Sequence, residues 1–316
     1  MTTASAPGKI ILFGEHAVVY GRPALAVPVM QIHVDVEVTD ASRAGIWIHA
    51  PNIGLHAELS SLPANHPIAA AIRAFPHPIP SPAGRGTPEG QGEGIEIHIS
   101  STIPVASGLG SGAAVTVALL RTLSSAFHRP LSDEQINSLA YKIEKLHHGT
   151  PSGIDNTVIT YARPVYFVRG QPIETFTVGA PFTIVIADTG VSAPTKESVG
   201  DVRRLWEADR SKWEKVFDEI GEIVQTAKEK IETGEWRSLS PLMDANHALL
   251  QQMTVSSPEL DRLVESARKA GASGAKLSGG GRGGNMIALV EADKAAQVSE
   301  ALMSSGAKRT IVTEIS

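Results

Sequence analysis

Residues 104–115 of the sequence read PVASGLGSGAAV. Its three glycines and two serines lead into an alanine-rich apolar segment, which is typical of a loop that turns sharply and begins a helix. A helix N-terminus leaves about four backbone N–H groups unpaired and carries a partial positive charge, so it can bind a nucleotide phosphate. A P-loop would add a Lys-Ser/Thr pair, which is missing here. The glycines therefore either form a packing turn or hold an anion whose counter-charge comes from elsewhere.

The composition is that of an ordinary globular protein. The chain has 316 residues, of which 42% are hydrophobic and 19% charged, and its net charge is −5. This length predicts one large or two medium domains, and the absence of a basic run argues against a nucleic-acid partner. There is no cysteine, hence no disulfide and no thiolate metal site. No apolar run approaches the roughly 20 residues of a membrane span, and the N-terminus is too polar for a signal peptide, so we expect a cytoplasmic protein.

Hydrophobic periodicity predicts the order of the secondary structure. Strands come first and are followed by mixed helices and strands without regular βαβ alternation, which indicates an α+β fold with two lobes. We place the boundary near residues 170–180 and expect domains over 1–175 and 176–316. The proline- and glycine-rich residues 75–94 are expected to be a surface loop. Strands are predicted over 9–39, 45–50, 94–100, 182–188 and the final RTIVTEI, and helices over 112–127, from 132 to 146, 199–232 and 293–305.

The helix expected from residue 132 ends in a group of polar residues. Ser-Asp-Glu-Gln at its start is a capping-box pattern. Glu144 lies beside the apolar face of this helix, and Asp155 follows eleven positions later, beyond a Gly-Pro-Gly loop. Ser152 and Asp155 are also consistent with a simple N-cap of the next helix. The expected apolar face consists of Ile136, Leu139, Ala140, Ile143 and Leu146.

Two further segments place polar residues where burial is expected. Lys9, Glu15 and His16 lie in APGKIILFGEHAVVYG (6–21), and a lysine in a buried strand is costly unless it has a partner or reaches the surface. The segment SGGGRGG surrounds Arg282 with five glycines, which permits close approach of a phosphate or carboxylate, or serves as a hinge.

Taken in order, these motifs resemble the galactokinase, homoserine kinase, mevalonate kinase and phosphomevalonate kinase (GHMP) superfamily. The matching features are PGK-x-ILFGEH, then P-x-x-x-GLGS-x-A, then HGTPSGIDN, then KLSGGG, and they run from residue 6 to about 290. GEHAVVYG and HGTPSGIDN look like the mevalonate kinases within it. The resemblance implies an N-terminal domain like ribosomal protein S5 and a C-terminal ferredoxin-like domain. It also implies phosphorylation of the 5-hydroxyl of mevalonate by ATP with Mg²⁺, for isoprenoid synthesis.

The resemblance also implies roles for individual residues. Asp155 would take the proton from the substrate hydroxyl, Lys9 would stabilise the transferring group, and Glu144 would hold Mg²⁺ with Ser111. ATP and mevalonate would be the partners, and a homodimer is compatible with the sequence. Residues of the ATP site would be Pro104, Ser107, Gly108, Leu109, Gly110, Ser111, Gly112 and Ala113. Residues of the mevalonate site would be Glu15, His16, Ser152, Thr195 and Gly280.

The sequence departs from the family pattern at two positions. Gly112 stands where the family usually has a serine that reaches Mg²⁺, and Arg282 stands where glycine is more common. An extra cation near the acceptor pocket would favour a more acidic substrate. Three alternatives to a mevalonate kinase stay open. They are a kinase acting on a phosphorylated mevalonate, a diphosphomevalonate decarboxylase, and a non-catalytic ligand-binding relative.

Overall fold

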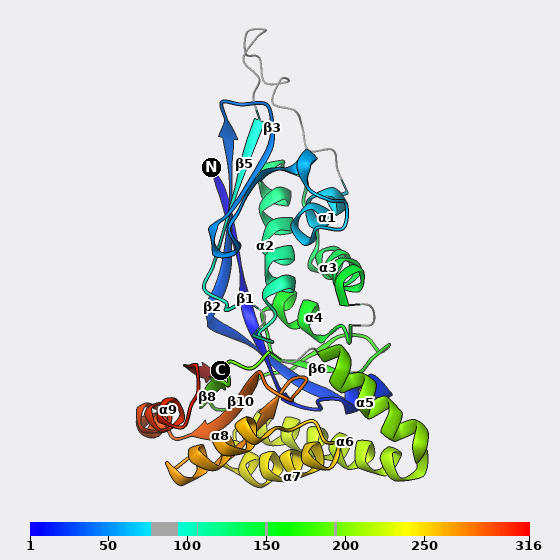
Figure 1. Ribbon diagram of the computed structural model, residues 1–316, viewed down its shortest axis with the longest axis vertical. Helices are drawn as coiled ribbons and strands as arrows, with labels where there is room; N and C mark the ends of the chain where they lie inside the picture. Colours follow the sequence, from blue (N-terminus) through cyan, green and yellow to red (C-terminus); the bar gives the residue numbers. More distant parts are fainter. Residues whose placement is uncertain (77–93, 106, 149–150, 193–194) are drawn as a thin grey trace. The chain divides into compact units, whose positions relative to one another are not determined.

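The structure is a computed structural model that describes residues 1–76, 94–105, 107–148, 151–192 and 195–316 (Figure 1). The side chains of 147–148 and 195–196 also lie outside the description. The chain divides into two compact units. Unit 1 consists of Met1–Gly8, Ile32–Val105 and Gly110–Ala162, and unit 2 of Lys9–Gln31, Ala106–Leu109 and Arg163–Ser316.

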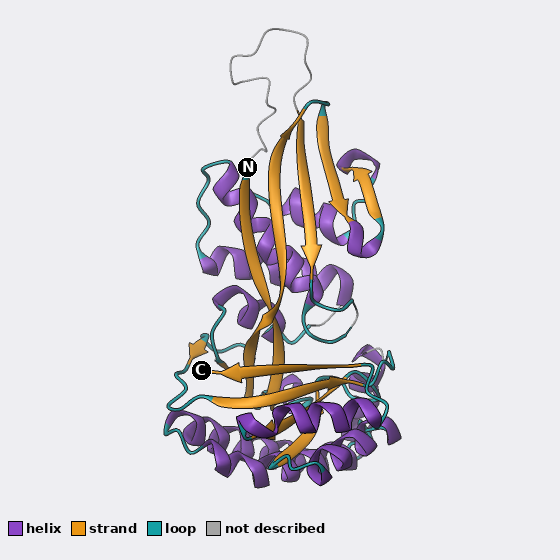
Figure 2. Ribbon diagram, turned by 90° about the vertical axis from the view of Figure 1, so that its left-hand side faces the viewer, coloured by secondary structure: helices purple, strands orange, loops and turns teal. Residues whose placement is uncertain are grey.

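Unit 1 contains most of a mixed β-sheet. Strands β1 (Thr2–Phe13) and β2 (Ala24–Ala41) pair with each other and run through both units. In unit 1, β2 pairs with β5 (Gly94–Ser101) antiparallel, β5 with β3 (Gly45–Ala50) parallel, and β3 with β4 (Leu55–Glu58) antiparallel. One face of this sheet packs against helices, and Figure 2 shows its other face with no helix over it. The alternation of residues such as Ile97, which is buried, with His98, which is exposed, follows from this one-sided packing.

The helices of unit 1 pack against one another beside the sheet (Figure 1). Helix α2 is apolar over most of its length and is largely buried, as its alanine-rich sequence predicts. The predicted capping box at the start of α3 is confirmed, because Ser132 N–H donates to Gln135 Oε1 at 2.9 Å and Gln135 N–H donates to Ser132 Oγ at 3.3 Å. Leu146, expected on the buried face, is instead 66% exposed at the end of this helix. The helices are α1 (Pro67–Ala74), α2 (Ser111–Ala126), α3 (Asp133–His148) and α4 (Ile154–Tyr161).

Unit 2 contains an antiparallel sheet in the order β11-β8-β10-β9. Strands β8, β9 and β10 are almost entirely buried. Helices α7 (Leu239–Gln252), α8 (Pro258–Lys269) and α9 (Ala295–Ser304) pack on this sheet. The chain order of strands and helices around this sheet is that of the ferredoxin-like fold, so the predicted fold class is confirmed. The strands are β8 (Phe182–Asp188), β9 (Gly274–Ser278), β10 (Asn285–Val290) and β11 (Arg309–Ile315). In the other sheet, β6 (Val165–Phe167) pairs with the start of β2 and with the short strand β7 (Glu174–Thr175).

The long charged helix expected over 199–232 is two helices. Helix α5 covers Thr195–Ala208 and α6 covers Arg210–Glu232, with a break at Asp209. The carboxylate of Asp209 accepts a hydrogen bond from Lys212 N–H at 3.0 Å, so this residue caps α6 instead of continuing α5. The remaining helices are α7 (Leu239–Gln252), α8 (Pro258–Lys269) and α9 (Ala295–Ser304), and short 3₁₀ turns cover Ala17–Tyr20, Pro51–Ile53, Leu59–Ser61, Trp236–Ser238 and Ala292–Lys294.

Two further expectations from the sequence concern the loop at 75–94 and membrane-spanning helices. Most of the loop expected over 75–94 lies outside the described residues. Within the described part of the chain, none of the helices has the length and apolar character needed to cross a membrane.

Candidate active site

The glycine loop leads into the N-terminus of α2 as its sequence predicts. Gly108 and Gly110 have φ angles of 77° and 80°, in the left-handed region where a residue with a Cβ is strained. Gly110 is the N-cap residue, and no side chain of a described residue caps the helix or places a negative charge in its first turn. The first N–H groups of this 16-residue helix can therefore serve an anion.

Two contacts within unit 2 fix the beginning of this loop. The backbone N–H of Lys9 donates to the Leu109 carbonyl at 3.0 Å, and Asn285 Nδ2 donates to the Ser107 carbonyl at 2.5 Å. Lys9 itself is only 4% exposed, so it does not extend its ammonium group into solvent. Strands β1 and β10 thus place a lysine and an asparagine beside the glycine loop.

Glu144 and Gly112 lie next to each other within unit 1. A Cβ atom on Gly112 would lie 3.3 Å from Glu144 Oε1, and Glu144 is 8% exposed on α3. The residue that departs from the family pattern is thus adjacent to the carboxylate expected to hold Mg²⁺. A carboxylate beside the first turn of a helix is chemically suited to Mg²⁺, which is usually held by one or two carboxylates together with substrate phosphates and water.

Asp155 lies in the first turn of α4, which follows Gly153 in the left-handed conformation. The hydroxyl of Ser152 accepts a hydrogen bond from Ile154 N–H at 3.3 Å, so Ser152 supports this turn directly. Helix α4 is tied to α3 through Asn156, which donates to Asn137 Oδ1 at 2.5 Å.

Glu15 forms a buried ion pair that the sequence analysis missed. Its carboxylate accepts a hydrogen bond from Lys276 Nζ, and both side chains have 0% exposure. Lys276 Nζ also donates to the Leu277 carbonyl at 2.7 Å. Burial raises the pKa of Glu15 and lowers the pKa of Lys276, and each partner opposes the shift of the other. A lysine within the apolar strand GAKLS was the signal that could have revealed this pair.

His16 contacts the second glycine segment within unit 2. Its Nε2 lies 3.1 Å from the Gly280 carbonyl, which can only accept, so Nε2 carries a proton and Nδ1 is left as an acceptor. Burial lowers the pKa of His16 to about 4, against the opposing effect of the Gly280 carbonyl, while the charge of Arg282 lowers it further. His16 is therefore a neutral imidazole near pH 7. Its φ of 62° marks a strained turn after β1.

Arg282 already has partners within unit 2. Its guanidinium forms an ion pair with Asp201 of α5, and its Nε donates to the Thr254 carbonyl at 3.2 Å. Asp201 also pairs with Arg204, so its single carboxylate is shared between two guanidinium groups and compensates the charge of Arg282 only in part. Thr195 begins α5, but its side chain lies outside the described residues.

The expected site residues are distributed over both units. Unit 2 contains Lys9, Glu15, His16, Ser107, Gly108, Leu109, Thr195 and Gly280, and unit 1 contains Pro104, Gly110, Ser111, Gly112, Ala113, Glu144, Ser152 and Asp155. Within unit 2 the structure joins Lys9 to the glycine loop and His16 to Gly280. Within unit 1 it joins Gly112 to Glu144.

Comparison with known proteins gives the class to which the chain belongs. The model for the GHMP kinases N terminal domain matches residues 79–163, and the model for the GHMP kinases C terminal domain matches residues 227–308. The fold and these two matches define a GHMP kinase, in agreement with the motifs in the sequence.

Individual relatives narrow this class. The chain is 37% identical to a mevalonate kinase of Pyrococcus abyssi over 100% of its own length and 96% of the relative, and 36% identical to a mevalonate kinase of Thermococcus sibiricus over 99% and 96%. The crystal structure of L. major mevalonate kinase in complex with R-mevalonate is similar with a TM-score of 0.83 and 28% identity, over 100% of this chain and 96% of that chain. The chain belongs to the mevalonate kinase family.

Proposed function

We propose that this protein transfers the terminal phosphoryl group of ATP to the 5-hydroxyl of mevalonate, giving 5-phosphomevalonate and ADP. The observation that carries the proposal is its similarity to mevalonate kinases over its whole length. The use of ATP follows from membership of a kinase family. The glycine-lined N-terminus of α2 supports the use of ATP, because its backbone N–H groups can bind phosphates even though the loop contains no lysine.

The proposed reaction assigns one proton transfer to Asp155. The substrate hydroxyl gives its proton to the Asp155 carboxylate while its oxygen forms a bond to phosphorus and the bond from phosphorus to the ADP oxygen breaks. Phosphoryl transfer depends mainly on positioned charge. We therefore propose that the Lys9 ammonium stabilises the charge on the transferring group and that residues 104–113 hold the phosphates through backbone N–H groups.

The residues present also fit the metal that the family implies. We propose that Glu144 and the Ser111 hydroxyl hold Mg²⁺ together with the phosphates, where the ion would neutralise phosphate charge. Glu144 lies beside Gly112 in the first turn of α2. An oxygen-only donor set of this kind suits Mg²⁺.

For the substrate we propose that His16, Ser152, Thr195 and Gly280 contact mevalonate. His16 can accept a hydrogen bond at Nδ1 because its Nε2–H is used by Gly280. Glu15 was also expected at the mevalonate, and its complete burial against Lys276 supports a role in fixing the turn that carries His16. The boundary between domains at 175, the cytoplasmic location and a homodimer are further proposals.

The first experiment is ADP release by the purified protein with ATP and Mg²⁺. The acceptors are mevalonate, 5-phosphomevalonate, 5-diphosphomevalonate, homoserine and galactose. Turnover with mevalonate alone is expected. Turnover with a phosphorylated mevalonate would replace this proposal with the alternative kinase, and no turnover with any acceptor would contradict it.

The role of Asp155 is tested by Asp155→Asn. The amide cannot accept the proton, so turnover should fall by about 10²–10⁴-fold while ATP binding measured by calorimetry stays nearly unchanged. Asp133→Asn is the matched control, because Asp133 is also in the first turn of a helix of unit 1 but pairs with Arg121 at 3.1 Å. Near-normal turnover of the Asp155 variant would show that the base is another group.

Gly112→Ser tests the loop. The new Cβ would lie 3.3 Å from Glu144 Oε1, which a small side-chain shift relieves, so the variant should fold and keep turnover within about tenfold. Its hydroxyl adds an oxygen beside Glu144, so half-maximal velocity should require less Mg²⁺. A large loss of turnover at saturating Mg²⁺ would show that this loop differs from the family arrangement.

A further inference from the structure

A row of histidines crosses β4, β3 and β5, the last three strands at one end of the sheet in unit 1. His49 on β3 lies opposite His98 on the parallel strand β5 and opposite His56 on the antiparallel strand β4. The neighbouring Ile48 and Ile97 are both completely buried on the other face. Because side chains alternate along a strand, Glu96 lies on the same face as His98, two positions earlier.

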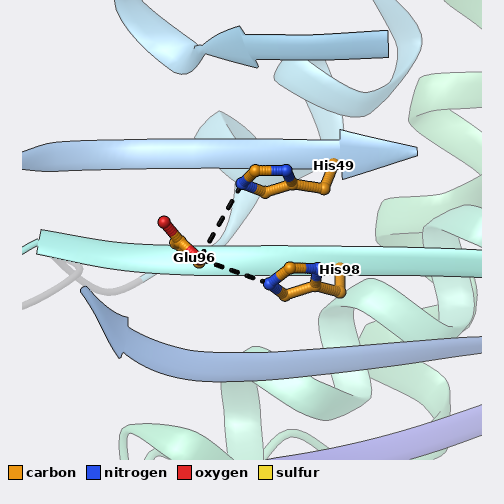
Figure 3. A group of neighbouring side chains, drawn as sticks. All are labelled: His49, Glu96 and His98. Atoms are coloured by element: carbon orange, nitrogen blue, oxygen red, sulfur yellow. Dashed lines mark ion pairs between the residues drawn. The ribbon is translucent and has the colours of Figure 1, made fainter. Parts of the chain in front are cut away.

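Three of these side chains converge on one point. Glu96 Oε2 lies 3.9 Å from His49 Nε2 and 3.4 Å from His98 Nε2, and Figure 3 shows both ring nitrogens directed toward the carboxylate. One ligand atom from each residue lies within 4.8 Å of the other two. Among the described residues, no other group of three histidine or acidic side chains meets this condition. The two imidazole rings are stacked, with centroids 4.5 Å apart.

We propose that His49, Glu96 and His98 form a binding site for a divalent transition metal of the zinc class. Two imidazole nitrogens and one carboxylate are a donor set that binds Zn²⁺ and leaves a fourth position for water. The sheet itself brings these donors together. Glu96 and His98 are two positions apart on β5, and His49 lies on the neighbouring strand β3. The nitrogen donors select Zn²⁺, Ni²⁺ or Cu²⁺ over Mg²⁺, which prefers oxygen. None of the three residues is among those proposed for phosphoryl transfer.

The cluster also contains a competitor for the carboxylate, the guanidinium group of Arg43. The side chain of Arg43 donates to Glu96 Oε1 at 3.0 Å and lies 3.3 Å from His49 Nε2. It also lies over the Trp47 ring, 3.6 Å from the centroid.

Arg43 is therefore the resident cation of the cluster, and a metal ion must displace it from the carboxylate. Glu96 cannot bind both cations at full strength, because Arg43 and the metal ion would repel each other at the same carboxylate. The side chains of Glu96 and Arg43 are 28% and 38% exposed, so both stay hydrated and the carboxylate can exchange one cation for another.

The test is a calorimetric titration of the full-length protein with ZnCl₂. The protein is first treated with a chelator, and Mg²⁺ is present in excess. One Zn²⁺ per chain is expected, and Co²⁺ should give the visible absorption of a low-symmetry site. His98→Ala and Glu96→Gln should each weaken binding by at least the roughly 10–100-fold that follows loss of a residue orienting a metal ligand. His33→Ala is the matched control, since His33 is an exposed strand histidine of unit 1 that pairs with a single carboxylate, Asp35, at 3.1 Å.

A second variant separates a built site from general binding by surface histidines. Arg43→Gln removes the competing cation, so it should bind Zn²⁺ several-fold more tightly than the wild type. Circular dichroism and mevalonate-dependent ADP release in Mg²⁺ should be unchanged in all four variants, which confirms that each is folded. The proposal is overturned if Zn²⁺ fails to bind, if His33→Ala weakens binding as much as His98→Ala, or if Arg43→Gln leaves the affinity unchanged.

Discussion

Two carboxylates of this molecule are each paired with a basic side chain, in opposite surroundings. Glu15 of unit 2 and its partner Lys276 have no exposed side-chain surface. Glu96 of unit 1 and its partner Arg43 are 28% and 38% exposed on a sheet face over which none of the described helices lies. The pKa of Glu15 is raised by burial in spite of Lys276, whereas the pKa of Glu96 is lowered because the effect of Arg43 outweighs its smaller desolvation.

The difference shows that the environment of an ion pair decides what the pair can do. Two charges withdrawn from water lose their hydration, so they depend on each other and cannot exchange partners without a large cost. Two charges at the surface retain water, so their mutual attraction is weak and another cation can replace one of them. The buried pair therefore fixes the turn between β1 and the short helix at Ala17–Tyr20, whereas the exposed pair can open to a ligand.

Removal of the buried lysine should have the largest effect. Lys276→Met leaves the Glu15 carboxylate buried without its cation, so the free energy of unfolding should fall by about 3–5 kcal/mol in a urea titration. The double variant Glu15→Gln with Lys276→Met removes both charges and should recover part of this loss. Lys269→Met is the control, because Lys269 pairs with Glu265 at the surface and should show no measurable change. Equal stability of the single and double variants would mean that the pair is not coupled.

The histidine beside this pair should make stability depend on pH. Burial lowers the pKa of His247 to about 4 from its ordinary value of 6.5; Asp261 opposes this shift, and Lys276 and Arg268 add to it. Between these values the unfolded chain binds a proton that the folded chain does not, so stability is full above pH 6.5 and decreases as the pH falls toward 4. The loss should reach up to about 3 kcal/mol.

His247→Asn tests this pH dependence. His247 Nδ1 accepts a hydrogen bond from Leu277 N–H at 3.3 Å, and the asparagine oxygen can replace that acceptor without titrating. Urea midpoints measured from pH 7 to 4.5 should decrease less steeply for the variant than for the wild type. Parallel curves for the two proteins would show that His247 does not titrate as described.

The exposed pair should contribute least to stability. Arg43→Gln removes a hydrogen bond and an ion pair at a hydrated surface, so the free energy of unfolding should fall by less than about 1 kcal/mol. Thermal unfolding of metal-free protein measures this change, and Glu96→Gln is the matched variant on the opposite side of the pair. A loss as large as that of Lys276→Met would remove the contrast between the two sites.

Much of the fold and part of the site could be predicted because the deciding interactions are local. The glycine loop, the helix that follows it and the capping box of Ser132 and Gln135 depend on residues a few positions apart. The break between α5 and α6 also depends on a local interaction, the N-cap of Asp209. It was not predicted, because charged residues and apolar periodicity continue through this position. The roles proposed for Lys9, Glu144 and Asp155 came from resemblance, and they stay predictions.

The class of protein could be recognised without a structure, since motif order and hydrophobic pattern are properties of the chain. Which distant residues meet depends on the three-dimensional fold. Glu15 and Lys276 are 261 positions apart, and His49 and His98 are brought together by the parallel register of β3 and β5. Such contacts depend on how buried strands align, and that alignment is set by the packing of the whole core.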